Sequence, residues 1–177
     1  MLSYAEFAPG AKVLDLGCGN GIVGICALEA GARVTMCDVL PEAVEAARYN
    51  LNANFPADIA DNAKVLVSDG FDGVADNDFE LILSNPPYHT DFSVAKRFIE
   101  GSFYHLATGG RLLMVTKRLD WYKNKLTAVF GGVKVRESDG YYVFIAEKRD
   151  VRPQNLKKKA EKARRKKEAA DNARVRR

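Results

Sequence analysis

The chain places a short apolar run directly before a glycine-rich turn in Val13-Leu14-Asp15-Leu16-Gly17-Cys18-Gly19-Asn20-Gly21. An apolar run that ends in an acid and glycines predicts a buried strand over 12–16 that enters a tight turn. Gly17, Gly19 and Gly21 would let the backbone of this turn approach a ligand closely, because they carry no Cβ. The stretch therefore predicts the first strand of an α/β sheet with a ligand site beside it.

Alternating helices and strands are predicted along the rest of the chain. The alternation favours a doubly wound parallel sheet that helices cover on both faces. The last two predicted strands flank Ser138-Asp139-Gly140 and are expected to form an antiparallel hairpin. Strands are expected at 33–37, 63–67, 80–83, 111–116, 133–137 and 141–147, and helices at 20–30, 41–54, 92–106 and 119–130.

Polar residues follow the predicted strands at the edge where open α/β sheets bind their ligands. Asp38, Asp69 and Asn85 each come directly or almost directly after a strand. Asp38 lies 21 positions after Gly17, about the spacing at which an acid reaches the hydroxyl groups of a ribose. This spacing alone does not separate a nicotinamide dinucleotide from another cofactor that contains adenosine.

Two details favour a cationic adenosine cofactor over a dinucleotide. Ile22 stands at the third glycine position of the strict dinucleotide pattern, and the carboxylate of Asp15 would meet a cation better than a pyrophosphate. The stretch 13–21 closely resembles the first motif of class I S-adenosylmethionine-dependent methyltransferases. That resemblance implies S-adenosyl-L-methionine as cofactor and a seven-stranded, mainly parallel sheet with a terminal reversed hairpin.

The same resemblance implies a role for each part of the site. The loop from Gly17 to Gly21 would lie along the methionine part of the cofactor, Asp38 would hold the ribose, and Asp69 would meet the adenine. A purely turn-forming role in Ser68-Asp69-Gly70 stays open for Asp69. The residues expected to bind the cofactor are Asp15, Gly17, Cys18, Gly19, Asn20, Gly21, Asp38, Val39, Asp69, Gly70 and Asn85.

The segment Asn85-Pro86-Pro87-Tyr88 is the candidate catalytic element. Two prolines leave carbonyl acceptors without their N–H donors and favour an extended backbone. The Asn85 side-chain oxygen and the Pro86 carbonyl would accept hydrogen bonds from an exocyclic amine, and Tyr88 would stack on its ring. These contacts position the nitrogen for in-line attack on a sulfonium methyl group.

The Asn-Pro-Pro-Tyr pattern is shared by methyltransferases that act on amino groups of adenine, guanine and glutamine. Together with Gly109-Gly110-Arg111-Leu112 and the stretch 117–126, it resembles the small methyltransferase domain of ribosomal RNA guanine-N2 methyltransferases. The resemblance covers roughly 10–147 and implies guanine N2 of ribosomal RNA as the target. Adenine N6 of RNA or DNA stays open as the target, because Tyr88 stands where the guanine-N2 methyltransferases usually carry Phe. Glutamine methylation and a non-catalytic RNA-binding module are weaker alternatives.

Charge divides the chain into two parts. Residues 1–147 hold 13 Lys and Arg against 19 Asp and Glu, a net charge of −6, whereas 148–177 hold 14 against 4, a net charge of +10. We therefore expect a methyltransferase domain over 1–148 and a basic tail over 149–177. The tail has too few large apolar residues to fold alone, and it is expected to bind RNA phosphates.

The remaining composition favours a soluble cytoplasmic protein, and the resemblance implies a role in ribosomal RNA processing. No apolar run approaches the ~18 residues that cross a membrane, and no charged-then-apolar leader opens the chain. Cys18, Cys26 and Cys37 are odd in number and lack metal-ligand spacing, so neither disulfides nor a metal site are expected. The sequence leaves the oligomeric state open.

Overall fold

The computed structural model describes residues 1–87 and 92–150. These residues form a seven-stranded sheet in the order β3-β2-β1-β4-β5-β7-β6. The strands β1 to β5 run parallel, and β7 is antiparallel to both β5 and β6. The strands are β1 (Lys12–Leu16), β2 (Arg33–Asp38), β3 (Ala63–Val67), β4 (Phe79–Ser84), β5 (Leu106–Thr116), β6 (Lys134–Ser138) and β7 (Tyr141–Glu147).

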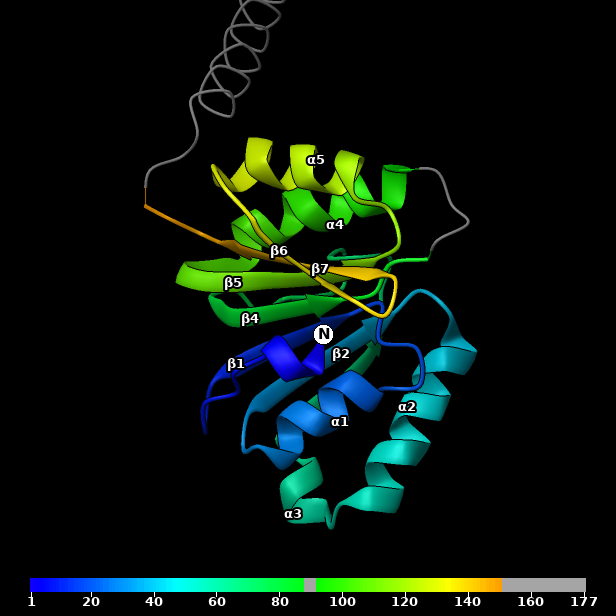
Figure 1. Ribbon diagram of the computed structural model, residues 1–177. Coiled ribbons are helices and arrows are strands. Elements are labelled where there is room, and N and C mark those ends of the chain that lie inside the picture. The colour runs from blue at the N-terminus through cyan, green and yellow to red at the C-terminus, as the bar shows by residue number, and fades with distance from the viewer. Residues whose placement is uncertain (88–91, 151–177) are drawn as a thin grey trace, which may run out of the picture.

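Helices cover both faces of this sheet, with α4 and α5 on one side and α1, α2 and α3 on the other (Figure 1). The predicted doubly wound α/β fold with a terminal antiparallel hairpin is therefore confirmed. The helices are α1 (Ile22–Glu29), α2 (Pro41–Asn54), α3 (Ala57–Ala60), α4 (Phe92–His105), α5 (Asp120–Phe130) and the 3-10 helix η1 (Leu2–Tyr4). Neither η1 nor α3 was predicted from the sequence.

The core forms two layers because successive residues of each strand face opposite sides of the sheet. Leu14 and Leu16 of β1 belong to the layer beneath α4 and α5, whereas Val13 belongs to the layer beneath α1 and α2. In β4, Ile82 faces the first layer and Leu83 the second. The central strands are thus apolar on both sides, as expected of strands in a parallel sheet with two helical layers.

Helix α1 is shorter than the predicted helix over 20–30. It starts at Ile22 because Gly21 adopts a left-handed conformation with φ of 83°. The backbone leaves the helix through Gly31, which is also left-handed, as is common for a glycine that follows a helix. A Cβ at Gly24 would lie 2.5 Å from the Cγ and Sδ atoms of Met36, so this glycine lets α1 pack tightly against β2.

Strand β5 begins five residues before the predicted strand over 111–116. The predicted helix over 92–106 ends at His105, and the strand then passes through Gly109, whose φ is 82°. The register with β4 shifts between Phe79 and the next paired residue, as in a β-bulge. Two glycines therefore accommodate a bulge here, in a segment where no strand was expected from the sequence.

No helix in residues 1–87 and 92–150 combines the length and the apolar character that crossing a membrane requires. The predicted methyltransferase domain over 1–148 contains every described helix and strand. Of the predicted basic tail over 149–177, residues 151–177 lie outside the described residues, so its role stays a prediction.

Candidate cofactor and methyl-transfer site

The carboxyl ends of β1 to β4 meet at one edge of the sheet. Leu16 at the end of β1 pairs with Cys37 of β2 and with Ser84 of β4, which brings three distant segments together. A cavity of about 380 Å³ opens at this edge. The predicted site residues that line it are Gly17, Asp38, Val39, Asp69, Gly70, Asn85 and Pro87.

The glycine turn is held in place by its own backbone. The amides of Gly17 and Cys18 both donate hydrogen bonds to the carbonyl oxygen of Cys37, each at 2.9 Å. The amide of Gly21 donates to the Cys18 carbonyl oxygen at 2.9 Å. The turn is therefore fastened to the end of β2, and Gly17 is left at the cavity wall.

Asp38 connects the two loops on either side of the cavity. One carboxylate oxygen, Oδ2, accepts a hydrogen bond from the Gly19 amide at 3.0 Å, and Oδ1 accepts one from the Leu40 amide at 3.1 Å. A carboxylate oxygen accepts more than one hydrogen bond, so these contacts leave acceptor capacity for hydroxyl groups. The geometry is compatible with the ribose contact predicted for Asp38, which stays a prediction.

Apolar side chains make up most of the remaining cavity wall. Val39 and Leu40 are 55% and 51% exposed, although large aliphatic side chains are usually covered. Val94 and Phe98 of helix α4 complete the wall, and a Cβ at Gly17 would lie 3.5 Å from the Phe98 ring. A flat aromatic base would cover this apolar surface, so the cavity suits the adenine of the expected cofactor.

Asp15 and Cys18 lie behind the turn and do not line the cavity. Asp15 is only 3% exposed, and its Oδ2 accepts a hydrogen bond from the Gly24 amide at 2.9 Å. Burial raises the pKa of Asp15 to about 7, against the opposing effect of that hydrogen bond. Burial likewise raises the pKa of the Cys18 thiol to about 12, which keeps it neutral. Direct cofactor contact stays a prediction for both residues.

Asn20 and Gly21 contribute to the local fold. The Asn20 carbonyl oxygen accepts a hydrogen bond from the Asn50 side chain of α2 at 2.9 Å, and its side-chain oxygen accepts one from the Ile22 amide at 3.4 Å. A Cβ at Gly21 would lie 2.9 Å from the Cβ of Ala47, so glycine permits α1 and α2 to meet. Neither residue lines the cavity.

The predicted catalytic segment begins at the end of β4. The Ser84 hydroxyl donates a hydrogen bond to a main-chain carbonyl of β1 at 2.8 Å, which anchors the start of the segment. Asn85 and Pro87 are exposed at the cavity, whereas Pro86 is buried. Tyr88 lies outside the described residues, so its stacking role stays a prediction.

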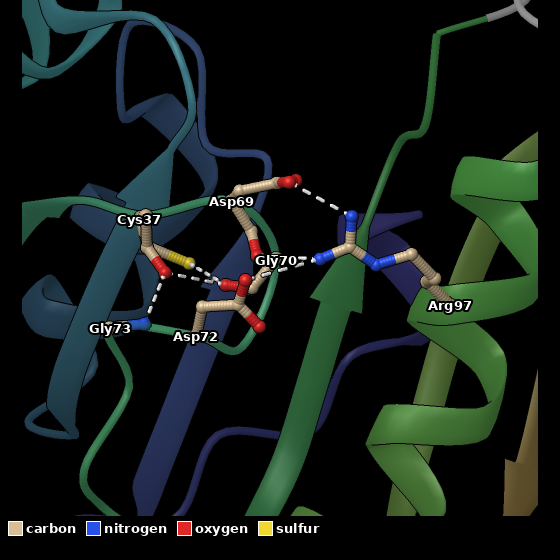
Figure 2. Close-up of polar contacts among 7 residues, drawn as sticks. Cys37, Asp69, Gly70, Asp72, Gly73 and Arg97 are labelled. Atoms are coloured by element: carbon tan, nitrogen blue, oxygen red, sulfur yellow. Dashed lines mark hydrogen bonds and ion pairs between the residues drawn. The ribbon is translucent and has the colours of Figure 1, made fainter.

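The turn after β3 carries Asp69 and is joined to helix α4 by a residue that the sequence did not reveal. Figure 2 shows Arg97 reaching from α4 toward Asp69 and Asp72. Its Nη1 contacts Asp69 Oδ2 at 2.9 Å, and its Nη2 donates to the Asp69 carbonyl oxygen at 3.0 Å. Ser68 closes the turn, because its hydroxyl donates to the Gly70 carbonyl oxygen at 2.9 Å.

A larger cavity of about 540 Å³ lies between the N-terminal segment and strands β5, β6 and β7. It contains none of the predicted cofactor or catalytic residues, so we place the candidate site at the smaller cavity. Within 1–87 and 92–150, His, Cys, Asp and Glu side chains form no cluster of three or more that could hold a metal ion.

The strand order, the reversed terminal hairpin and the glycine turn at the end of β1 define a class I S-adenosylmethionine-dependent methyltransferase fold. The chain belongs to the methyltransferase small domain family, whose model matches residues 2–145. S-adenosyl-L-methionine is the methyl donor of this class, and the cavity described above fits its adenosine part.

Relatives that carry ribosomal RNA in their names are about one-third identical to this chain over the aligned residues. The large-subunit methyltransferase G of Psychromonas ingrahamii is 32% identical over 76% of this chain and 37% of its own length. The small-subunit methyltransferase C of Pseudomonas aeruginosa is 32% identical over 84% of this chain and 45% of its own length. The chain thus spans less than half the length of these relatives.

A solved structure supports the same grouping. The 16S ribosomal RNA guanine-N2 methyltransferase of Thermus thermophilus, solved with AdoMet and guanosine, is 28% identical to this chain with a TM-score of 0.73. The match covers 80% of this chain and 38% of that protein. A methyltransferase from Pyrococcus furiosus, at 24% identity and a TM-score of 0.68, shares the fold.

Proposed function

We propose that this protein transfers a methyl group from S-adenosyl-L-methionine to an exocyclic amine of a nucleobase in ribosomal RNA, and that the target is guanine N2. The observation that carries the proposal is the shared cavity at the sheet edge. Gly17, Asp38 and Asp69 line it beside Asn85 and Pro87, so a cofactor site and an amine-binding segment open into one space.

The cofactor supplies a methyl group on a sulfonium, whose sulfur leaves as a neutral thioether. We assign Asp38 to the ribose, and Val39, Leu40 and Phe98 to the faces of the adenine. The assignment rests on the apolar cavity wall and on the two aliphatic side chains that are left half-exposed there. Gly17 keeps the wall near the methionine part free of a side chain.

Asn85 and Pro86 are assigned to the amine. The lone pair of an exocyclic amine is delocalised into the ring, so acceptors that bind its hydrogens make the nitrogen a better nucleophile. The new N–C bond forms as the S–C bond breaks, and the electron pair of that bond goes to sulfur. The nitrogen then releases a proton to water, so no strong general base is needed.

The RNA substrate is supported by the basic residues outside this cavity. The larger cavity beside β6 and β7 is lined by four cations and by the carboxylates of Glu6 and Glu147, and Glu6 pairs with Arg111 at 3.0 Å. The other cations include Arg149, which stands where the predicted tail begins. Because phosphate contacts give affinity without sequence preference, we propose that this groove and the tail hold RNA while the cavity selects the base. The basic residues are Arg111, Lys134, Arg136 and Arg149.

This proposal assigns catalysis to residues 1–148, RNA affinity to this groove and above all to the tail 149–177, and the activity to the cytoplasm. A direct test incubates the full chain with labelled S-adenosyl-L-methionine and undermethylated ribosomal RNA, and then resolves the nucleosides. We expect label in N2-methylguanosine with the natural chain and none with Asn85→Ala. Label in N6-methyladenosine or in protein would overturn the guanine assignment.

A further inference from the structure

Arg97 binds one neighbouring residue through two different groups. Its guanidinium holds the side-chain Oδ2 of Asp69 at 2.9 Å and the main-chain carbonyl oxygen of the same residue at 3.0 Å. Asp72 adds a longer contact to Nη2 at 3.6 Å. The rigid, planar fork of an arginine suits this kind of double contact, and a lysine ammonium offers no equivalent geometry.

This arrangement contributes more to orientation than to stability. The side chains of Arg97 and Asp69 are 50% and 61% exposed, and exposed ion pairs add little to the free energy of unfolding. Binding the carbonyl and the carboxylate of one residue together does, however, restrict the side-chain torsion angles of Asp69. Arg97 therefore fixes the direction of that carboxylate.

Asp69, whose carboxylate Arg97 fixes, lines the cavity together with Ser68 and Gly70. Its Oδ2 contacts Arg97, and Oδ1 is the second acceptor oxygen of the carboxylate. Phe98, the residue after Arg97, packs within 3.5 Å of the position of a Cβ at Gly70. Helix α4 thus supplies an apolar surface for a flat base and also sets the acceptor beside it.

A carboxylate acceptor at the rim of an apolar cavity discriminates between purines. It accepts a hydrogen bond from a 6-amino group, whereas a 6-oxo group in the same place would bring two acceptors together. Discrimination of this kind depends on direction, because a hydrogen bond weakens steeply when it is misaligned. A residue that fixes the carboxylate is therefore able to set the preference.

We infer that Arg97 is a positioning residue that directs Asp69 Oδ1 toward the 6-amino group of the cofactor's adenine, and so sets the preference for adenosyl over inosyl ligands. The inference rests on the proposed use of S-adenosyl-L-methionine. The inference gives helix α4, which follows the amine-binding segment in the chain, a role in cofactor specificity.

The test measures binding of S-adenosyl-L-homocysteine and of its 6-oxo counterpart, S-inosyl-L-homocysteine, by calorimetry. For Arg97→Gln we expect about a tenfold loss of affinity for the adenosyl ligand and little change for the inosyl ligand. Arg97→Lys keeps the charge without the fork and should lose most of the same preference. Lys96→Gln, which removes the neighbouring exposed charge from α4, is the matched control and should change neither affinity.

Three outcomes would overturn the inference in distinguishable ways. An equal loss of affinity for both ligands in Arg97→Gln would show that Arg97 only supports the fold. An unchanged affinity for the adenosyl ligand would show that Arg97 is not needed to orient the Asp69 carboxylate. A natural chain that binds neither ligand would overturn the proposed cofactor as well. Urea unfolding of the variants, compared with Lys96→Gln, verifies that they are folded.

Discussion

Replacing Asp15 with Asn should stabilise the protein, and the gain should increase with pH. The Asp15 carboxyl group is buried beneath the glycine turn and accepts the Gly24 amide at 2.9 Å. Burial is the main cause that raises its pKa from 3.8 to about 7; the Gly24 hydrogen bond opposes the shift, and the nearby Asp38 carboxylate adds to it. An Asn side-chain oxygen can accept the same hydrogen bond without carrying a charge.

The sign and size of the effect follow from the two pKa values. In the unfolded chain Asp15 loses its proton near pH 3.8, whereas in the folded protein it keeps the proton until about pH 7. Between these values the folded state binds the extra proton, so the free energy of unfolding falls by about 1.4 kcal/mol for each pH unit as the pH rises. Over the whole interval the loss reaches about 4 kcal/mol, which Asp15→Asn would remove.

The assay is urea unfolding of the natural chain and of Asp15→Asn at pH values from about 5 to about 8. The difference between the two free energies of unfolding should rise with pH and level off above about pH 7. A fixed cost of burying the amide shifts this difference by a constant and leaves its slope unchanged. Glu45→Gln, on the exposed side of α2, controls for the loss of one negative charge. A difference that stays flat across the range would refute the reasoning, because Asp15 would then be ionised in the folded protein throughout.

Other variants test the packing and the proposed function. Gly24→Ala should cost about 1–3 kcal/mol in urea unfolding because its Cβ would lie 2.5 Å from Met36 atoms, and the same substitution should cost less when it is introduced into a Met36→Ala chain. A Gly24→Ala protein as stable as the natural chain would contradict the close packing of α1 on β2. Asn85→Ala should abolish turnover and leave cofactor affinity nearly intact, so normal turnover would exclude the amine-binding role. Deleting residues 150–177 should weaken RNA binding and flatten its salt dependence far more than it changes cofactor affinity; unchanged RNA affinity would remove the tail from the proposal.

Most of the fold was predictable because its elements are bounded by residues with strong local preferences. Helix α2 starts at Pro41 as expected, since proline suits the first turn of a helix. The strands β3 and β7 also have their predicted bounds. The start of β5 was not predictable, because two consecutive glycines usually end a strand or helix. Only the pairing of β5 with β4 on both sides of Gly109-Gly110 shows that the strand continues through a bulge.

The polar half of the site was predictable and the apolar half was not. Asp38, Asp69 and Asn85 follow strands, and parallel strands bring their carboxyl ends to one edge whatever the details of packing. Phe98 and Arg97 lie on a helix, where periodicity shows an apolar face but not which side chain reaches a cavity formed by other strands. The role of Gly24 was also missed, because the Met36 side chain that requires it comes from another strand.

The inward hydrogen bonds of the glycine turn have a consequence for competition among ligands. Phosphates usually bind such turns through free amides at the start of the following helix. Here the amides of Gly17 and Cys18 are used by a backbone carbonyl, and that of Gly24 by a carboxyl group. Nucleoside triphosphates and dinucleotides therefore find few free donors at this turn, so the site should stay available to its methyl donor amid an excess of phosphorylated metabolites that share the same adenosine.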